Sequence, residues 1–490
     1  MYIDNLRHLK KASAVQLMSN SKAGEREPKL KVISLILGMG TLAAGYGIAL
    51  TINGSLSSML YFFIAAVLVI IGSYLLFVSL SIAVLKFLKK NKKYYYKDKH
   101  FLSISGILHR MKTNGIGLAS IAVLCTGIII ILSVTLSINS SMSDIVSKTM
   151  KKDYQAAILG TFGPSTEYSK IKDAKNQVAN FIEETGTKKD KVESVTVGES
   201  LSVFGRKQGS ALLATDNQSL KSIDVGITTL DSYNKENGTS YKLEKNHILV
   251  ASNRTALLQI NSLTFAGKKY SITKVKNTIP ANVGIEAYAI VVPDYKTLTE
   301  AARYYVNVNS ATGKKILPYI TISGTWNVKN PSSEYAKKLK VKANNRGLVI
   351  ESKEEFRKQT YELNGGFLFL GVLIGCIFLI GTLLITYYKQ VSEGFEDRQK
   401  YQIMKKVGLP DKLIKQTASN QIVWMFFIPL IVALVHSLVA SKIVYQLLGL
   451  FGVHSYLKYI SEMAIIIGSF AIIYLIIFKL TSNVYYKIVR

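Results

Sequence analysis

Cysteine is nearly absent from this 490-residue chain, which has only Cys125 and Cys376, both inside long apolar stretches. The polar block between those stretches, residues 139–366, has none, so it must fold without disulfides. A block of more than two hundred residues can do so, because a chain of that length buries enough surface to form a core.

Motifs of catalysis are absent as well. No glycine-rich loop ends in Lys-Ser or Lys-Thr, the pattern of a phosphate-binding loop. His247, the one histidine of block 139–366, is part of KNHILVAS and is expected to precede a strand rather than to bind a metal. No set of acids, bases or metal ligands converges in the sequence. We therefore expect no enzyme activity, no cofactor and no metal site, and whatever energy the protein uses must come from a partner or a gradient.

Long apolar runs are what the chain has in abundance. A helix needs about 20 residues to cross the hydrocarbon core of a bilayer, and only helices or closed barrels satisfy their backbone there. Six runs are close to that length or exceed it: Val32–Ile52, Ser58–Phe87, Gly115–Ile138, Phe367–Tyr388, Gln421–Tyr445 and Ala464–Leu480. The sequence therefore predicts an α-helical membrane protein with six transmembrane helices, three on each side of the polar block.

Positive charge predicts the orientation of these helices. Lys and Arg gather at residues 1–31, 86–112 and 389–415, which fall on one side of the membrane if the helices alternate. Segments rich in Lys and Arg are cytoplasmic, so we expect a cell-membrane protein with both termini inside. The expected parts are a cytoplasmic segment 1–31, three helices in 32–138, an extracellular domain 139–366, and three helices in 367–490 with a cytoplasmic loop 389–420.

The net charge of +30 would suggest nucleic acid as the partner of a soluble protein. In the membrane half of this chain, however, the excess lies almost wholly in the expected cytoplasmic segments, where it marks topology and attracts anionic lipid. We therefore expect no nucleic-acid partner. The expected extracellular domain is also basic, so an anionic partner at the cell surface stays open.

The block 139–366 mixes two periodicities. Alternating apolar and polar residues predict strands near residues 195–203 and a hairpin around Leu263–Ile272. Helical spacing predicts three helices: Tyr168–Glu184, Tyr295–Val306 and Glu334–Ala343. Together these elements predict an α+β domain between the third and fourth transmembrane helices.

The sequence Ser352-Lys-Glu-Glu355 has the form of a capping box, which opens a helix. A helix beginning there would continue directly into the fourth apolar run and join the domain to the membrane. Gly365 and Gly366 are the positions at which it could break. A flexible stalk is the alternative to a continuous helix.

The apolar runs hold few ionisable groups, which argues against a transporter driven by an ion gradient. His436 is the exception, and without a carboxylate partner it is expected to pack rather than relay protons. Glu462 is expected at the membrane interface. Gly371 and Gly375, four residues apart, permit close helix contact, and Pro429 is expected to kink the fifth helix.

The loop 389–420 has the pattern of a short docking helix. Four charged residues open it: Glu393, Glu396, Asp397 and Arg398. Tyr401, Met404 and Val407 then form an apolar row at three-residue spacing, and Gly408 ends the helix before a second one enters the next apolar run. Such a ridge suits docking into a groove of another protein. A helix that lies on the lipid surface is the alternative.

Three segments carry a resemblance to a known family. They are YYKQVSEGFEDRQKYQIMKKVGLPDKLIKQTASNQIVWMFFIPLIVALVHSLVA, MKTNGIGLASIAVLCTGIIIILSVTLSI, and LMSNSKAGEREPKLK followed by LGMGTLAAGYGIAL. They resemble the FtsX-like permeases of ABC transporters, and among these the bacitracin-exporter type of Gram-positive bacteria. The first segment is similar to that family's coupling loop, the second to the helix that leads into its large extracellular domain. The third is similar to a linker and the helix that follows it.

The resemblance implies a permease that protects against cell-wall-targeting peptide antibiotics. Its implied partners are a cytoplasmic ABC ATPase dimer, a sensor histidine kinase, and a peptide antibiotic or its lipid-linked complex. Such permeases usually have ten spans, and this chain matches the last six. A four-span N-terminal half or a second copy of the chain is therefore an expected partner. The alternative function is a receptor that reports peptide antibiotic to the kinase without transport.

Overall fold

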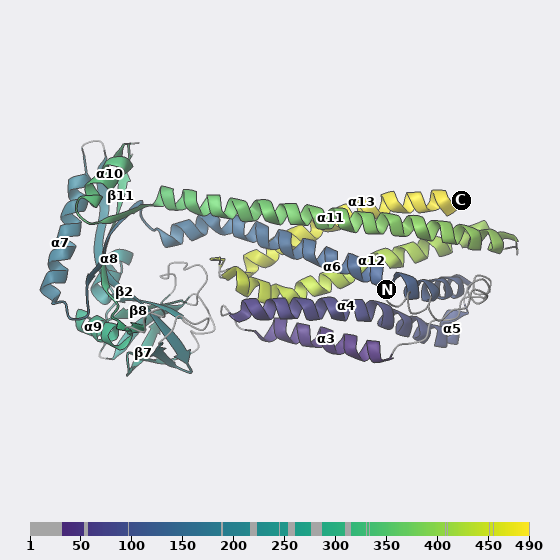
Figure 1. Cartoon of the computed structure of the whole chain (residues 1–490), viewed down its shortest axis with the longest axis horizontal. Helices are drawn as coiled ribbons and strands as arrows, with labels where there is room; N and C mark the ends of the chain where they lie inside the picture. The colour runs from purple at the N-terminus through teal and green to yellow at the C-terminus, as the bar shows by residue number, and fades with distance from the viewer. Residues whose placement is uncertain are drawn as a thin grey trace.

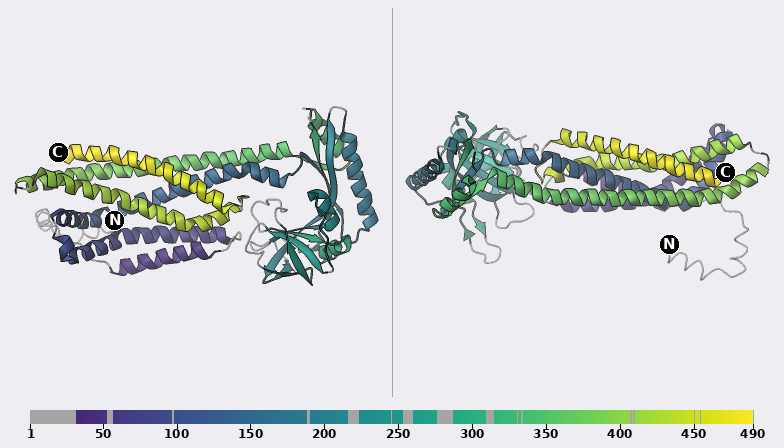
Figure 2. Two further views of the ribbon diagram at one scale, coloured as in Figure 1. Left: turned by 180° about the vertical axis from the view of Figure 1, so that it is seen from behind. Right: turned by 90° about the horizontal axis from the view of Figure 1, so that it is seen from above.

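The computed structural model describes residues 32–489 except 53–56, 97, 188–189, 216–222, 245, 253–259, 276–286, 309–314, 330, 333, 407, 409, 450 and 454. The segment 1–31, expected to be cytoplasmic, lies outside the described residues. The molecule is elongated: long helices form a bundle at one end, and strands with short helices form a domain at the other (Figure 1). Figure 2 shows the same division from behind and from above.

The bundle is built from long helices and one short one. Their bounds are α3 (Val32–Thr51), α4 (Ser57–Lys90), α5 (Lys92–Tyr95), α6 (Asp98–Thr149), α11 (Lys353–Lys406), α12 (Asp411–Gly449) and α13 (Tyr456–Val489). All but α5 are long and apolar enough to cross a membrane, which confirms the predicted set of six apolar helices. Large side chains such as Phe369 and Ile465 remain 64% and 61% exposed, an arrangement that suits contact with lipid rather than water.

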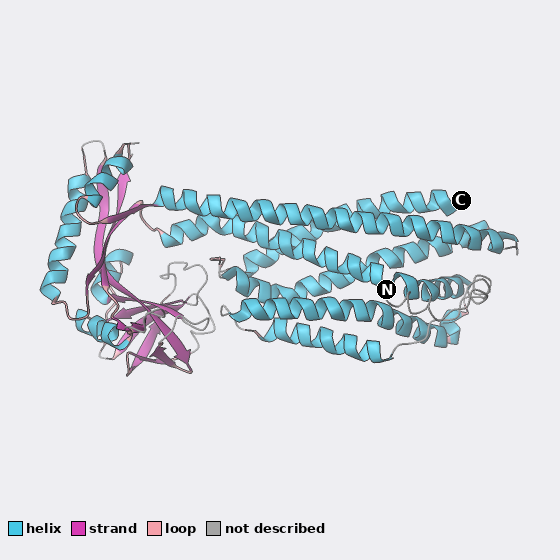
Figure 3. Cartoon of the chain, viewed as in Figure 1, coloured by secondary structure: helices cyan, strands magenta, loops and turns pink. Residues whose placement is uncertain are grey.

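The sheet domain, residues 154–352, lies between α6 and α11 in the chain, and its strands gather at one end of the molecule (Figure 3). Its main sheet has ten strands in the order β12-β1-β11-β2-β3-β6-β7-β5-β8-β4, and β9 pairs with β10 apart from it. The strands are β1 (Tyr154–Phe162), β2 (Lys191–Gln208), β3 (Ala211–Ala214), β4 (Ile223–Thr229), β5 (His247–Ser252), β6 (Ser262–Phe265), β7 (Lys268–Lys274), β8 (Ala287–Val292), β9 (Asn307–Val308), β10 (Lys315–Ile316), β11 (Ile320–Lys329) and β12 (Val349–Ser352).

The long strand β2 connects two parts of this sheet. Its first half pairs with β11, and its second half pairs with both β3 and β4. Because β4 also ends the row of strands that begins at β3, the second part closes on itself and leaves no free edge there. The mixture of parallel and antiparallel pairs, with helices on the sheet, agrees with the predicted α+β class.

Four short helices pack with the sheet; helical spacing predicted three of them, and α8 was not predicted. They are α7 (Tyr168–Thr185), α8 (Leu230–Asn237), α9 (Tyr295–Tyr304) and α10 (Tyr335–Asn344). On α7, Ile171, Val178 and Phe181 follow helical spacing and are buried in the domain core together with Trp326. Burial of this apolar stripe explains why the otherwise polar segment of α7 is a stable helix.

The predicted hairpin is present as β6 and β7, joined by a tight turn. Ala266 and Gly267 both have positive φ, 49° and 77°, the combination that a two-residue hairpin turn with right-handed strand twist requires. Phe265 is fully buried on the inner face of this hairpin. The short turn therefore sets the register that places Phe265 in the core.

Two helices run from the bundle into the sheet domain: the one predicted from Ser352, and the one that the family resemblance implied after the third apolar run. Helix α6 extends beyond its apolar run as far as Thr149, and α11 is one unbroken helix from Lys353 to Lys406. The docking helix expected after the fourth span is therefore not a separate helix; its residues form the end of α11. Gly365 and Gly366 lie within α11 without interrupting it, so the continuous connection is correct and the flexible stalk is wrong.

Candidate functional site

The end of α11 remote from the sheet domain divides into an inward and an outward face. Glu393, Asp397 and Tyr401 recur at four-residue spacing, which places them on one side of the helix, and each is at most 6% exposed. Tyr485 of α13 donates a hydrogen bond of 2.5 Å to an Asp397 carboxylate oxygen. This inward face therefore fastens α11 to α13.

Glycine allows the two helices to approach closely at this point. A Cβ atom at Gly394 of α11 would lie 3.2 Å from Cγ2 of Ile488 on α13, closer than most contacts of real Cβ atoms. The phenol ring of Tyr485 is fully buried beside this contact. Glycine at position 394 thus brings α13 within hydrogen-bonding range of Asp397.

The predicted docking residues are consequently not all on one surface. Glu393, Asp397 and Tyr401 face the bundle, whereas four others are exposed: Glu396, Arg398, Gly408 and the unpredicted Ile403, which is 62% exposed. The Met404 side chain and residue Val407 lie outside the described residues. Sequence spacing could group these positions by helix face, but it could not indicate which face meets α13.

A short tip joins α11 to α12 and projects beyond the neighbouring helices (Figure 1). Helix α11 ends at Lys406, Gly408 has a positive φ of 93°, and Pro410 precedes the start of α12 at Asp411. Glycine at positive φ followed by proline is a strong helix stop, as the sequence predicted. Exposed Lys405 makes the tip basic.

The opposite end of α11 is anchored to the sheet domain. The Ser352 hydroxyl accepts a hydrogen bond of 3.2 Å from the Glu355 amide, which is half of the predicted capping box. The Lys353 amide donates to the Asp153 carbonyl at 2.8 Å, and Lys340 of α10 pairs with Glu355 at 2.7 Å. Because β12 leads into α11 without a linker, the helix and the sheet must move together.

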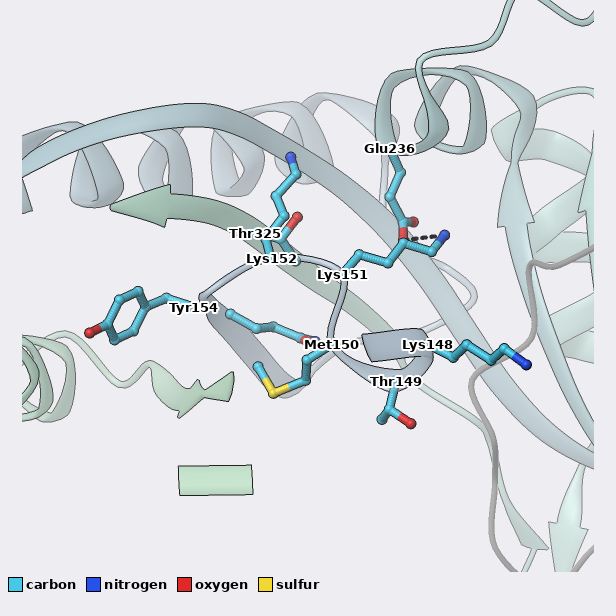
Figure 4. Close-up of a pocket in the computed structure, with 9 residues that line it drawn as sticks. Lys148, Thr149, Met150, Lys151, Lys152, Tyr154, Glu236 and Thr325 are labelled. Atoms are coloured by element: carbon cyan, nitrogen blue, oxygen red, sulfur yellow. Dashed lines mark ion pairs between the residues drawn. The ribbon is translucent and has the colours of Figure 1, made fainter. Parts of the chain in front are cut away.

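Helix α6 enters the sheet domain through a cluster of lysines, shown in Figure 4. Lys151 lies 3.6 Å from the carboxylate of Glu236 and donates to the amide oxygen of Asn237 at 2.7 Å. Lys152 donates to the Thr196 hydroxyl at 2.8 Å, and its burial lowers its pKa. The lysines enclose a cavity of about 70 Å³ and attach α6 to both β2 and α8.

The two helices that enter the domain are tightly packed against each other. A Cβ at Gly371 would collide with the Thr135 hydroxyl of α6, and one at Gly375 would lie 2.9 Å from Cδ2 of Leu132. The two glycines are four residues apart and therefore share a helix face. Close backbone contact of this kind replaces the hydrophobic effect as the source of helix association in lipid.

A polar cluster closes the α6–α13 contact at the sheet-domain end of the bundle. Glu462 is only 7% exposed and accepts hydrogen bonds from Ser137 and Ser140. Lys458 donates to the Ser140 carbonyl at 2.9 Å. The interpretation of Glu462 as an interfacial residue missed these partners, because Ser137 and Ser140 are more than three hundred positions away in the sequence.

Pro429 and His436 both lie in α12. Pro429 leaves a turn of the helix without one backbone donor, and the neighbouring Phe426 carbonyl accepts a hydrogen bond of 3.0 Å from Tyr474 of α13. The two nitrogens of His436 lie 2.5 Å from the Tyr46 hydroxyl and 2.8 Å from that of Ser73. Both residues thus take part in contacts between helices.

The described residues contain no group of three or more His, Cys, Asp or Glu side chains that could hold a metal ion. The arrangement instead couples the two ends of the molecule mechanically. Helix α11 connects the sheet domain to an exposed basic tip, and α6 and α13 are packed along it. A displacement of either end of α11 must therefore change the position of the other.

Comparison with known proteins identifies a class of relatives. No protein-family profile matches the chain. It is 22% identical over 488 residues to the ABC transporter permease protein YxdM of Bacillus subtilis, a match covering 97% of this chain and 71% of that protein. It is 18% identical over 464 residues to the uncharacterized ABC transporter permease YvcS of the same organism, a match covering 89% of this chain and 66% of that protein.

These likenesses make the chain a distant homologue of ABC transporter permeases. A permease is the membrane component of such a transporter and is not itself an enzyme, so the relationship implies an ATPase partner in general. Together with the six apolar helices, it supports a location in a membrane.

Proposed function

We propose that this chain is the permease of an ABC transporter that protects against cell-wall-targeting peptide antibiotics of the bacitracin type. In this proposal the sheet domain is extracellular and takes the peptide or its lipid-linked complex. A separate ATPase dimer binds at the tip between α11 and α12, and a sensor histidine kinase lies nearby in the membrane. The family resemblance of the tip segment supports the antibiotic class, and the distant permease relatives support the transporter.

The observation that carries the mechanism is the unbroken course of α11 from Lys353 to Lys406. Closure of the ATPase dimer moves the tip, and because α11 contains no break, the motion reaches the sheet domain. Helix α13 follows, since the Asp397–Tyr485 hydrogen bond joins it to α11. The sheet domain then changes its position over the membrane surface and releases the bound peptide.

Docking of the ATPase can be tested at the outward face of the tip. Ile403 is 62% exposed, and burying a carboxylate in its place at an interface is costly. We expect Ile403→Asp to reduce copurification of the ATPase at least tenfold. Gln402→Asp adds the same charge at the adjacent exposed position and is the control. Equal retention of the ATPase by both variants would refute docking through Ile403.

Transmission along α11 can be tested at Gly365, where an added Cβ atom would have no neighbouring atom within 4 Å. Proline at this position removes a backbone hydrogen bond and clashes with the preceding turn, at a cost of about 3 kcal/mol or more. Alanine is accommodated and favours the helix by up to about 1 kcal/mol. We expect Gly365→Pro to abolish antibiotic resistance and Gly365→Ala to preserve it, at equal membrane levels of both variants. Full resistance with Gly365→Pro would contradict the mechanism.

A receptor that signals to the histidine kinase without transport is the second candidate. The observation that favours it is the scarcity of ionisable groups in the apolar runs; His436 is the exception, and its two nitrogens are engaged by Tyr46 and Ser73. A strain that lacks the ATPase distinguishes the two proposed functions. Kinase signalling that persists there would support the receptor, and its loss would support the transporter.

A further inference from the structure

A cavity of about 260 Å³ lies within the helix bundle, between α3, α4, α6, α11 and α12. Small residues line it from several helices: Gly45, Ala49, Ala65, Ala66, Gly127 and Ala440. Its volume is more than ten times the roughly 15 Å³ that one water molecule needs. Interiors of proteins are normally packed without spaces of this size, so a molecule with matching chemistry is expected to fill it.

The depth of the cavity can be read from α6 and α11. Gly127 lies near the middle of the apolar run 115–138 of α6, about 17 Å from either end at about 1.5 Å per residue. Phe378, which packs directly against Gly127, lies near the middle of the apolar run of α11. The hydrocarbon core of a bilayer is about 30 Å thick, so the α6 and α11 side of the cavity lies near its middle. Ala49 of α3 and Ile443 of α12 also line the cavity and lie near the C-terminal ends of their apolar runs.

Polar groups in the wall are engaged by the protein itself. The Tyr46 hydroxyl lies 2.5 Å from Nδ1 of His436, and the other nitrogen of that ring lies 2.8 Å from the Ser73 hydroxyl. Thr126 donates to the Ala122 carbonyl at 2.8 Å. The remaining lining is aliphatic or aromatic, and such a cavity does not attract water. The wall therefore recognises hydrocarbon and offers no site for a charged headgroup.

The surrounding helices also decide what kind of hydrocarbon fits. A transmembrane helix of a partner is about 10–12 Å across with its side chains, too wide for a space already bounded by five helices. On α4, Ile70 contributes to the cavity and is 39% exposed. A flexible chain can enter beside Ile70, where the bundle meets lipid.

We propose that this cavity is a binding site for one acyl chain of a membrane phospholipid. Because the cavity recognises no headgroup, the lipid that fills it is selected by its concentration in the membrane. Phospholipid is the most abundant source of hydrocarbon chains at this depth. The chain fills the space between the α3–α4 hairpin and the rest of the bundle. It is held by the many weak dispersion contacts that a close-fitting wall provides. This site is independent of the proposed antibiotic specificity.

Photolabelling tests the site directly. The full chain with its partner subunits is reconstituted in bilayer nanodiscs containing a phospholipid with a diazirine near the middle of one acyl chain. After illumination, labelled peptides are mapped by mass spectrometry. We expect labelling at the cavity surface of α6 and α12, around Gly127 and Ala440, in addition to the outer surface of the bundle. Labelling confined to the outer surface would overturn the proposal.

Substitutions that fill the cavity test whether the labelling comes from a chain inside it. Ala440→Leu places a larger side chain into the space, and Ala66→Leu does so from α4. Both should lower cavity labelling at least fivefold. The matched control is Ala464→Leu, at an exposed position of α13, which should leave it unchanged. If the filled variants retain full cavity labelling while circular dichroism shows unchanged helix content, the acyl-chain assignment is wrong.

A competition experiment separates an acyl chain from a polyprenyl chain. Unlabelled polyprenyl phosphate is added to the nanodiscs at one molecule per protein, far below the phospholipid. An acyl-chain site should keep its labelling under these conditions. Loss of cavity labelling with preserved labelling of the outer surface would show a prenyl-selective site and overturn the proposed ligand.

Discussion

Tyr485 of α13 and Asp397 of α11 are both buried and share a hydrogen bond of 2.5 Å between the phenol and the carboxylate. A charged acceptor makes such a bond stronger than one between neutral groups. The pair lies at the end of α11 that leads to the exposed tip. It therefore decides whether α13 follows a movement of that tip or separates from it.

Removal of this hydrogen bond should loosen the α11–α13 contact. Tyr485→Phe deletes the phenol hydroxyl and should cost about 1.5–3 kcal/mol, the usual contribution of a hydrogen bond to a charged group. The thermal unfolding midpoint of the purified chain should fall by several degrees. Tyr486→Phe is the neighbouring control, and equal midpoints for the two variants would contradict the importance of the bond.

Close packing of α6 against α11 should not tolerate a side chain at Gly371. An alanine there meets the Thr135 hydroxyl, and overpacking of this kind typically costs about 1–3 kcal/mol. Gly381→Ala is the control, because its Cβ would lie 3.7 Å from Leu124 in ordinary contact. We expect a lower unfolding midpoint for Gly371→Ala only. Partial recovery in the double variant with Thr135→Ala would identify the clash as the cause.

The sheet domain contains a buried ion pair whose partners should depend on each other. Glu199 of β2 is 2% exposed, pairs with Lys175 of α7, and accepts hydrogen bonds from Thr229 and Ser232. Lys175→Met leaves the carboxylate without its cation and should cost about 3–5 kcal/mol. Lys172→Met, at an exposed position of the same helix, should cost little.

Denaturant unfolding followed by Trp326 fluorescence measures this effect, in a Trp424→Phe background that leaves one tryptophan. The double variant Lys175→Met/Glu199→Leu should recover most of the loss, since no charge then remains buried. Additive losses in the double variant would show that the two residues act independently.

Alkaline pH should destabilise the sheet domain through Tyr154. Burial raises the pKa of Tyr154 to about 12, from a value near 10 in an unfolded chain. Because the folded state keeps this proton longer, the stabilising contribution is complete below about pH 10 and is lost as the pH rises towards about 12. Tyr154→Phe should flatten the pH dependence of the denaturation midpoint over that interval.

The readout for this effect is again Trp326, whose ring stacks on Tyr154 with centroids 5.6 Å apart. Tyr319→Phe, at a residue that is 48% exposed, is the control and should leave the pH dependence as it is. An unchanged profile in Tyr154→Phe would assign the alkaline loss to other groups.

Local patterns predicted the elements whose signals are contained in a short stretch. Six apolar runs predicted the spanning helices, the stripe of Ile171 and Val178 predicted α7, and Ser352 predicted the start of α11. In each case a few neighbouring residues carry the physical cause. Chain length, helix periodicity and a capping hydroxyl act over at most a few turns.

Features that depend on distant partners were not predictable in this way. Glu462 finds its serines on α6, and Asp397 finds Tyr485 on α13. Helix α6 continues to Thr149 through a polar segment because the residues Ile145 and Val146 bury against other parts of the fold. The closure of the sheet on β2 likewise needs long-range pairing, which no local pattern encodes.

The unbroken α11 also restricts how this chain can vary. At 54 residues and about 1.5 Å per residue, the helix is about 80 Å long, and each residue turns it by about 100°. A single insertion between Ser352 and the bundle would therefore turn the attachment of α11 to the sheet domain by more than a quarter turn about the helix axis, out of phase with the second attachment through α6. Seven inserted residues, close to two full turns, would shift the domain outward by about 10 Å with its facing nearly unchanged. Insertions in this segment should therefore be tolerated only in numbers close to whole helical turns, whereas surface loops can change length by single residues.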